Sequence, residues 1–470
     1  MKKILLLAVA VIFTAMFVGH SFAVEASFDG QYRVRAFAIE NAQDFNDNIK
    51  ADSDSWIDQR FRLNITLKES PVTGYVQLQI GGNNGPSSSK VWGANSDTDA
   101  VNGTNLSVVA RQAYLDFPIG PVQLRLGRTE ERHGFMGGGM FENIADRYIV
   151  TYKASPELVV SFIHAKATEV STGTSAGQTA ANAGVSADGN DNDRNIYHLG
   201  FTYKPQGAMY DVSARAYYVR DGLNYISRTG ASTAGGDWDA WWLTAQTTLK
   251  FNPVKIYLSA AYVDGESNPA NGTTSYDIQA YALHGDINAT FGIVTVGLVG
   301  GIGSGDDNTT DDQLETFYAP AGAGYIQTHL FWQSGTGDYS SNFMDSASIR
   351  TNLNTQNGSR ETLSNVTWAG LYADIKATDA LTLGIKGATF NKTESLDNTE
   401  DHIGEEIDLT LNYKIHKGLS LFAFAAWFMP DDGIICNTTN NQATACINGT
   451  VGSHNQDTVN EYYARIQWDF

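Results

Sequence analysis

The sequence is poor in several residue types, and each scarcity argues against a class of protein. Cysteine occurs twice and proline ten times in 470 residues. After the first two dozen residues, no apolar run approaches the roughly 20 residues that a membrane-spanning helix needs. Basic residues number 31 against 51 acidic ones, a formal net charge of −20. These counts argue against a disulfide scaffold, a helical membrane protein and a nucleic-acid-binding protein, since phosphate binding favours a basic surface.

What is abundant favours β structure. The chain has 46 glycines, 11% aromatic residues and 42% hydrophobic residues, which is enough apolar material to fold. Beyond the N-terminal segment there is no helical periodicity, whereas alternation of apolar and polar residues recurs along the whole chain. The composition predicts an all-β protein.

The N-terminal segment is predicted to be a cleavable signal peptide. Lys2 and Lys3 are followed by an apolar run from Ile4 to Val18 and by the small-residue exit Ser21-Phe22-Ala23. This pattern is typical of export signals, and cleavage is expected after Ala23. Residues 1–23 are therefore the predicted signal and residues 24–470 a single domain, which is exported without Lys2 and Lys3 and is more acidic still.

The exported part consists of paired alternating segments of about ten residues each. In the pair that spans residues 56–83, Ile57, Phe61, Leu63, Ile65 and Leu67 share one face, and the other face carries Asp58, Arg60, Arg62 and Asn64. A short turn from Ser70 to Gly74 joins the two segments. Short turns and long, acidic connections alternate strictly along the chain. This sorting predicts a transmembrane antiparallel β-barrel with short periplasmic turns and long extracellular loops.

The alternation predicts about eighteen strands, an even number that puts both chain ends at the periplasmic rim and lets the last strand close against the first. The long connection 303–364 could hide two more strands, so sixteen to twenty strands are compatible with the pattern. The predicted spans are 27–40, 56–69, 74–83, 105–117, 121–131, 145–154, 157–167, 194–204, 209–220, 239–252, 254–264, 274–287, 290–302, 365–377, 380–392, 404–416, 418–429 and 459–470.

The final strand ends in an aromatic residue. In "EYYARIQWDF", Ile466, Trp468 and Phe470 lie on one face and would contact lipid near the periplasmic interface. Such an ending resembles the C-terminal strand of bacterial outer-membrane proteins. The resemblance implies that Trp468 and Phe470 form an assembly signal for the barrel-insertion machinery.

A narrower resemblance covers residues 111–128. The stretch "RQAYLDFPIGPVQLRLGR" is similar to a hairpin of bacterial outer-membrane porins of the alginate-export and general-porin kind, although many relatives have Gln where this chain has Thr129. The resemblance implies a channel of 16 or 18 strands for small hydrophilic, often anionic, solutes. An eighteen-stranded lumen is also too wide for side chains to fill, which favours a water-filled channel.

Several arginines are predicted to face the lumen. A basic stripe on the wall would favour anionic solutes, because guanidinium groups match carboxylate and phosphate geometry. The alternative is that the arginines pair with lumen acids such as Asp58, Asp116, Glu406 and Asp408 and only stiffen the wall. The predicted stripe comprises Arg33, Arg35, Arg60, Arg62, Arg125, Arg147, Arg215 and Arg465.

Two segments are candidates for narrowing the pore. The charged residues Glu130, Glu131, Arg132 and His133 precede three consecutive glycines, so this loop could fold into the mouth, or it could be a surface excursion. The connection 303–364 is the other candidate, since ordered loops of that length usually have a function.

The remaining motifs are few. Cys436 and Cys446 are expected to form a local disulfide in an oxidising compartment. The acidic clusters at Asp306-Asp307 with Asp311-Asp312, and at residues 188–193, could bind Ca²⁺, but neither has the full spacing of a known calcium loop, which favours a solvated acidic surface. No catalytic or haem motif occurs, so we expect no enzyme, no cofactor and no bound metal.

The sequence thus predicts a porin of the Gram-negative outer membrane that passes small hydrophilic solutes by diffusion. Its expected partners are outer-membrane lipid, lipopolysaccharide and the insertion machinery, and a homotrimer is possible. Alternative functions are a substrate-specific or polysaccharide-export channel, a surface adhesin, or a structural barrel that partners another outer-membrane protein.

Overall fold

The computed structural model gives the fold for most of the strand-forming chain. It describes residues 24–41, 54–81, 90–91, 107–134, 141–168, 194–222, 224–226, 232–234, 236–269, 275–308, 310–317, 365–394, 401–431 and 457–470. These residues form strands and turns, and no helix among them is long and apolar enough to cross a membrane.

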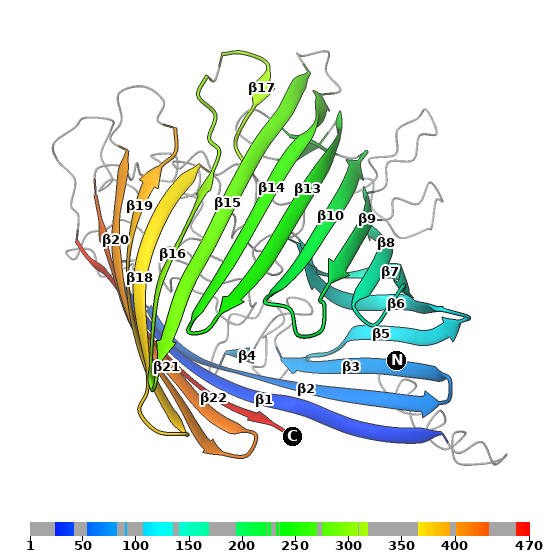
Figure 1. The fold of residues 1–470 in the computed structure, drawn as a ribbon, viewed down its shortest axis with the longest axis horizontal. Helices are drawn as coiled ribbons and strands as arrows, with labels where there is room; N and C mark the ends of the chain where they lie inside the picture. Colours follow the sequence, from blue (N-terminus) through cyan, green and yellow to red (C-terminus); the bar gives the residue numbers. More distant parts are fainter. Residues whose placement is uncertain are drawn as a thin grey trace, which may run out of the picture.

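Eighteen long strands form one closed antiparallel barrel, as the alternation predicts (Figure 1). Each strand pairs with the next along the chain, and β22 pairs with β1 to close the sheet. The strands are β1 (Glu25–Glu40), β2 (Asp54–Glu69), β3 (Val72–Gly81), β5 (Ser107–Ile119), β6 (Val122–His133), β7 (Phe141–Lys153), β8 (Leu158–Thr168), β9 (Arg194–Tyr203), β10 (Tyr210–Asp221), β13 (Gly236–Phe251), β14 (Val254–Pro269), β15 (Tyr276–Phe291), β16 (Val294–Gly303), β18 (Val366–Lys376), β19 (Leu381–Lys392), β20 (His402–His416), β21 (Leu419–Pro430) and β22 (Val459–Asp469).

Four shorter strands lie in the long connections. β4 (Lys90–Val91) pairs with β2 beyond the end of β3, and β11 (Asn224–Ile226) pairs with β12 (Ser232–Ala234) in a separate small sheet. β17 (Gln313–Leu314) pairs in parallel with β15. The stretch "GYIQTHLFW", where further strands were possible, lies outside the described residues.

One predicted turn is wrong. The sequence suggests a turn near Asn288, but β15 continues to Phe291 and the chain turns at Gly292 and Ile293. Gly292 has a φ of +61°, which glycine adopts without a steric penalty. The Asn288 amide instead donates to the Asp286 carboxylate within the strand, at 2.9 Å.

The outward face of the barrel is apolar, as lipid contact requires. Large hydrophobic side chains alternate along the strands with buried ones, and they include Leu283, Leu371 and Ile385, each at least half exposed on the outside of the barrel. A soluble protein rarely exposes so wide an apolar surface. The alternation therefore separates a lipid face from an inner face, as in other barrels that cross the outer membrane.

The inner face changes character along the strands. Toward the long-loop rim, side chains from most strands form one buried hydrophobic cluster, which we call the inner collar. Its members are Phe37, Ile39, Ala145, Ala165, Ile196, Tyr217, Val219, Trp238, Ala240, Trp242, Ala261, Val263, Ile278, Ala280, Ala282, Val299, Leu314, Phe317, Val366, Trp368, Ala388, Phe390, Ile403, Phe424, Ala426, Phe428, Val459 and Tyr463. Since water does not reach these side chains, the outer part of the interior is packed rather than fully water-filled.

Part of the connection after β16 extends the barrel wall beside β15, beyond the end of the β15–β16 ladder, and contributes to this packing. β17 brings Gln313 and Leu314 alongside Asp277 and Ile278 of β15. The Ser304 hydroxyl donates to the Glu315 carbonyl at 2.6 Å and anchors the segment. Leu314 and Phe317 thereby enter the inner collar.

The closing seam explains why the chain ends in an aromatic residue. The backbone of Gly30 exchanges two hydrogen bonds with Phe470, at 3.0 and 3.1 Å, and the Phe470 ring stacks on Phe61 with ring centroids 5.8 Å apart. A Cβ atom on Gly30 would lie 2.3 Å from the Arg62 carbonyl oxygen and 2.7 Å from the Phe470 ring. Glycine is therefore required at this position for the terminal ring to pack at the seam.

We expect the Gly30→Ala substitution to reduce the fraction of folded barrel in the outer membrane more strongly than Phe470→Ala. The first forces backbone atoms apart at the seam, whereas the second removes a partly exposed ring worth about 1 to 2 kcal/mol. The ratio of folded to unfolded protein on unheated gels measures both effects. Gly74→Ala is the matched control, because a Cβ there meets only ordinary contacts at 3.7 Å or more. Equal assembly of the Gly30 and Gly74 variants would contradict the role of the seam.

Candidate functional site

Arginines of the first two strands and the last strand lie side by side on the inner face. The register places Arg33 opposite Arg60 and Arg35 opposite Arg465, and Arg62 follows on β2. We call these five residues the arginine wall. Like charges directly opposite each other destabilise a sheet. Such an arrangement therefore needs compensating partners or anionic ligands.

Arg35 has a strong partner within the wall. Its guanidinium group donates two hydrogen bonds to the Asp58 carboxylate, with Nε to Oδ1 at 2.8 Å, and both side chains are almost fully buried. Amide groups take part elsewhere, since Arg60 donates to the Gln31 side chain at 2.9 Å. Arg35 is thus neutralised by a carboxylate within the arginine wall.

Arg111 also faces the interior, and sequence alternation missed it. The β3–β5 register shifts at Gln77 and Leu78, so that Arg111 and Gln112 bulge together on β5. The bulge turns Arg111 inward, where it is buried. Its guanidinium group forms a bidentate ion pair with Glu130 and donates to the Gln77 side chain at 2.8 Å.

The other predicted arginines face the interior further round the barrel. Arg125 on β6 bridges Asp116 at 2.9 Å and Glu131 at 3.5 Å, and it lies over the Tyr114 ring. Arg215 lies 3.3 Å from the His198 ring nitrogen. A cavity of about 290 Å³ is lined by Asp116, Gln123, Arg125, Glu131, Arg132, Ile149, Thr151, Val159, Ser161, Ile163, Thr202 and Arg215. Arg147 is buried on the neighbouring β7.

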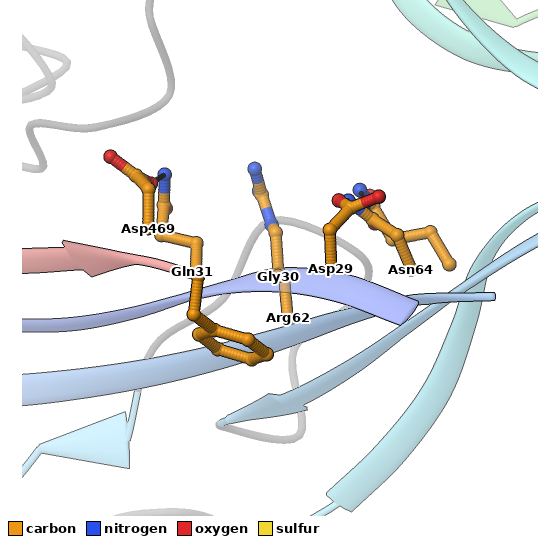
Figure 2. Close-up of a pocket in the computed structure, with 8 residues that line it drawn as sticks. Asp29, Gly30, Gln31, Arg62, Asn64 and Asp469 are labelled. Carbon is orange, nitrogen blue, oxygen red and sulfur yellow. Dashed lines mark hydrogen bonds between the residues drawn. The ribbon is translucent and has the colours of Figure 1, made fainter. Parts of the chain in front are cut away.

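The arginine wall ends in an open cavity of about 420 Å³ at the short-turn rim. Figure 2 shows the Arg62 side chain between Gln31 with Asp469 and Asp29 with Asn64, all directed toward the same open side. The Arg62 Nε donates to the Gln79 side chain at 2.8 Å. One guanidinium group surrounded by amide donors could bind a carboxylate, and the two aspartates confine the positive potential to the centre.

Another part of the inner face is acidic. Asp286, Asp374, Glu406 and Asp408 gather around Lys386 on the inner face of β15, β18, β19 and β20. The Tyr372 hydroxyl donates to the Asp286 carboxylate at 3.0 Å. Two of the acids that could have paired with arginines do so, since Asp58 binds Arg35 and Asp116 binds Arg125. Glu406 and Asp408 act electrostatically on Lys386.

Other predicted site residues take different places. Glu130, Glu131, Arg132 and His133 lie on β6 in the barrel wall and not in a loop, because the strand pairs with β7 as far as His133. Trp468 and Phe470 lie at the closing seam with their rings 4.8 Å apart. Cys436 and Cys446 lie outside the described residues.

One acidic cluster lies near the long-loop rim. Carboxylate oxygens of Asp306, Asp307 and Glu315 lie within 4.8 Å of one another, whereas Asp311 and Asp312 are not part of this group. Burial and the negative charge of Asp307 raise the pKa of Glu315 above its ordinary value. The cluster therefore holds at least one proton more readily than isolated carboxylates do.

The fold and the inner face define a class: a closed, eighteen-stranded antiparallel barrel with an apolar outward face and a charged inner face. Among solved structures, the outer-membrane protein OpdK of Pseudomonas aeruginosa is similar with a TM-score of 0.55 and 10% identity over 94% of this chain and 99% of that chain. OpdL and OccK9 of the same organism have TM-scores of 0.54 and 0.53 and identities of 12% and 14%, each over 95% of this chain and 99% and 98% of theirs. OpdK has also been crystallised with vanillate. No protein-family model matches the sequence, and no curated protein is detectably similar to it.

Proposed function

We propose that the protein is an outer-membrane channel for small hydrophilic solutes that carry a carboxylate or another anionic group. The observation that carries this proposal is the arginine wall, which places five guanidinium groups on adjacent strands and opens into the cavity around Arg62. Guanidinium groups bind carboxylates in a bidentate geometry. The similar fold of OpdK, a protein crystallised with the carboxylate vanillate, supports the same reading.

The inner collar favours a substrate-specific channel over an open diffusion pore. An eighteen-stranded barrel without such packing would enclose a wide aqueous lumen. Here apolar side chains occupy the outer part of the interior, the arginine wall lies on β1, β2 and β22, and the acidic group around Lys386 lies on β15 and β18 to β20. A solute would therefore follow one side of the barrel, along the arginines.

Planar-bilayer recording of the refolded mature protein across a KCl gradient tests this proposal. We expect small conductance steps with a reversal potential toward that of chloride. Addition of benzoate should reduce the current at millimolar concentration, because the anion binds in the arginine wall. A folded barrel that prefers potassium and ignores benzoate would contradict the proposal.

Export and assembly complete the proposal. We propose that residues 1–23 are removed on export to the Gram-negative outer membrane, and that the terminal strand is recognised by the insertion machinery there. N-terminal sequencing of protein purified from outer membranes should begin at Val24. Cross-linking of the native protein distinguishes a homotrimer from a monomer, both of which fit the closed barrel.

A further inference from the structure

β5 and β6 separate in the half of the barrel near the long loops. Their ladder runs from Ile119 and Val122 at the turn only as far as Ala113 and Arg128. Beyond this point the outer part of β5 stays with β3, and the outer part of β6 stays with β7. Figure 1 shows the two strands diverging from their shared turn. In the other short-turn hairpins of the barrel, the ladder reaches within two residues of the end of the shorter strand.

Two local features produce the split at the same level. On β5, the bulge at Arg111 interrupts the regular ladder. On β6, Gly127 has a φ of +127°, and a Cβ atom there would lie 2.4 Å from the Ala113 carbonyl oxygen. Only glycine fits this close approach, after which the two strands diverge.

Side chains, rather than a backbone ladder, span the split. The Gln112 side-chain oxygen accepts a hydrogen bond from the Glu130 backbone N–H at 3.1 Å, and the Thr129 hydroxyl lies 3.5 Å from the same oxygen. The bidentate ion pair between Arg111 and Glu130 crosses from one strand to the other. A ligand carboxylate can replace Glu130 in this pair, because it offers the guanidinium group the same two acceptors.

The split also lies where the inner collar is interrupted. No member of the collar comes from β3, β5 or β6 within the described parts of the chain. The buried inner side chains of these strands are polar instead, namely Gln77, Gln79, Arg111, Gln112 and Thr129. On the outward face, apolar Val108 of β5, 61% exposed, lies on one side of the split, and Arg128 of β6 lies on the other.

We propose that the split is a lateral gate through which an amphipathic carboxylate passes between the barrel interior and the surrounding membrane. The solute's carboxylate takes the place of Glu130 on Arg111, the outer ends of β5 and β6 move apart, and its apolar tail passes on the Val108 side. This path bypasses the packed outer part of the interior. The inference rests on the proposed function, in which the solute carries a carboxylate. It adds that the solute also has an apolar tail and that it leaves the barrel between β5 and β6.

A reversible cross-link across the split tests the gate. The variant Gln112→Cys with Thr129→Cys, in a Cys436→Ser and Cys446→Ser background, is joined with a bis-maleimide that contains a cleavable disulfide. Proteoliposomes are then assayed for uptake of radiolabelled decanoate and for chloride conductance. We expect at least a tenfold loss of decanoate uptake with unchanged chloride conductance, and recovery after reduction. The control joins Ala245→Cys and Ala260→Cys, which lie opposite each other in the complete β13–β14 ladder.

Three outcomes would overturn the lateral gate. Uptake of decanoate by the cross-linked protein at the unlinked rate means that the strands need not separate. A parallel loss of chloride conductance means that the split belongs to an axial pore. If the unlinked protein conducts chloride but takes up no decanoate, the lateral gate is wrong and the proposed channel function stands. If the folded protein does neither, both the gate and the proposed channel function are wrong. Glu130→Gln provides a second variant, because weakening the ion pair should accelerate decanoate uptake, and an unchanged rate in folded protein also counts against the proposal.

Discussion

Replacing Arg33, Arg60 and Arg62 together with glutamine is expected to lower the chloride-to-potassium permeability ratio roughly tenfold. A unit charge about 6 Å from a permeating ion contributes about 0.7 kcal/mol in water, so three charges contribute about 2 kcal/mol before salt screening reduces the effect. Arg35 is left in place because its replacement would leave the buried Asp58 carboxylate without its arginine partner. The reversal potential across a KCl gradient measures the ratio.

A matched control removes the same net charge from the outward face. Arg128, Lys166 and Arg220 occupy outward positions on β6, β8 and β10, and their replacement with glutamine should leave the reversal potential nearly unchanged. A similar shift in both triple variants would mean that selectivity depends on overall charge. In that case the arginine wall would have no particular role in permeation.

Asp58→Asn is expected to destabilise the folded barrel by about 3 to 5 kcal/mol. The substitution leaves the buried Arg35 guanidinium beside Arg465 without its carboxylate partner, and an uncompensated buried charge carries a cost of this size. The shift of the urea unfolding midpoint of the refolded barrel measures the loss. The double variant Arg35→Gln with Asp58→Asn should recover part of it, because both buried charges are then removed.

Asp211→Asn serves as the comparison for this prediction. Asp211 pairs with Lys250 at 3.4 Å, but the lysine side chain is more than half exposed. Exposed ion pairs contribute between 0 and about 1 kcal/mol. If Asp58→Asn were no more harmful than Asp211→Asn, the Arg35–Asp58 pair would not be the anchor of the arginine wall.

Much of the barrel could be predicted because its information is local. Alternation with a period of two assigns a face to each residue, and turn residues such as Pro253 and Gly418 mark where strands reverse. The eighteen strands and the inward positions of Arg33, Arg35 and Arg60 follow from these two signals. Asn288 misled the assignment because asparagine favours turns, whereas here its side chain bonds to Asp286 within the strand.

Arg111 shows where alternation fails. Counting back from Asp116 places it on the lipid face, where an arginine would cost a few kcal/mol at mid-membrane. That implausible cost was the available signal for a bulge, and it falls within the hairpin that resembles those of porins. The pairing of Arg111 with Glu130 could not be predicted from the sequence. The three glycines a few residues after Glu130 suggested a flexible loop there, whereas Glu130 lies on β6.

The inner collar was partly visible in the sequence as well. Phe37 and Ile39 share a face with Arg33 and Arg35, so the same count that points the arginines inward points these apolar residues inward too. Their burial depends on contacts with other strands, such as the stacking of Phe37 on Trp56 and its edge-to-face contact with Tyr463. Such contacts cannot be derived from one strand alone.

The arginine wall is assembled from strands that are far apart in the sequence, with Arg33 and Arg35 on β1 and Arg465 on β22, five residues before Phe470. Neither strand contains the complete group. On the proposed channel function, a nascent barrel that has not yet joined β22 to β1 lacks the intact arginine wall, so transport and completion of the fold are expected to begin together. Solute flux in living cells can therefore serve as a direct reporter of finished barrels, and premature truncation at either end should abolish transport rather than leave a partly selective pore.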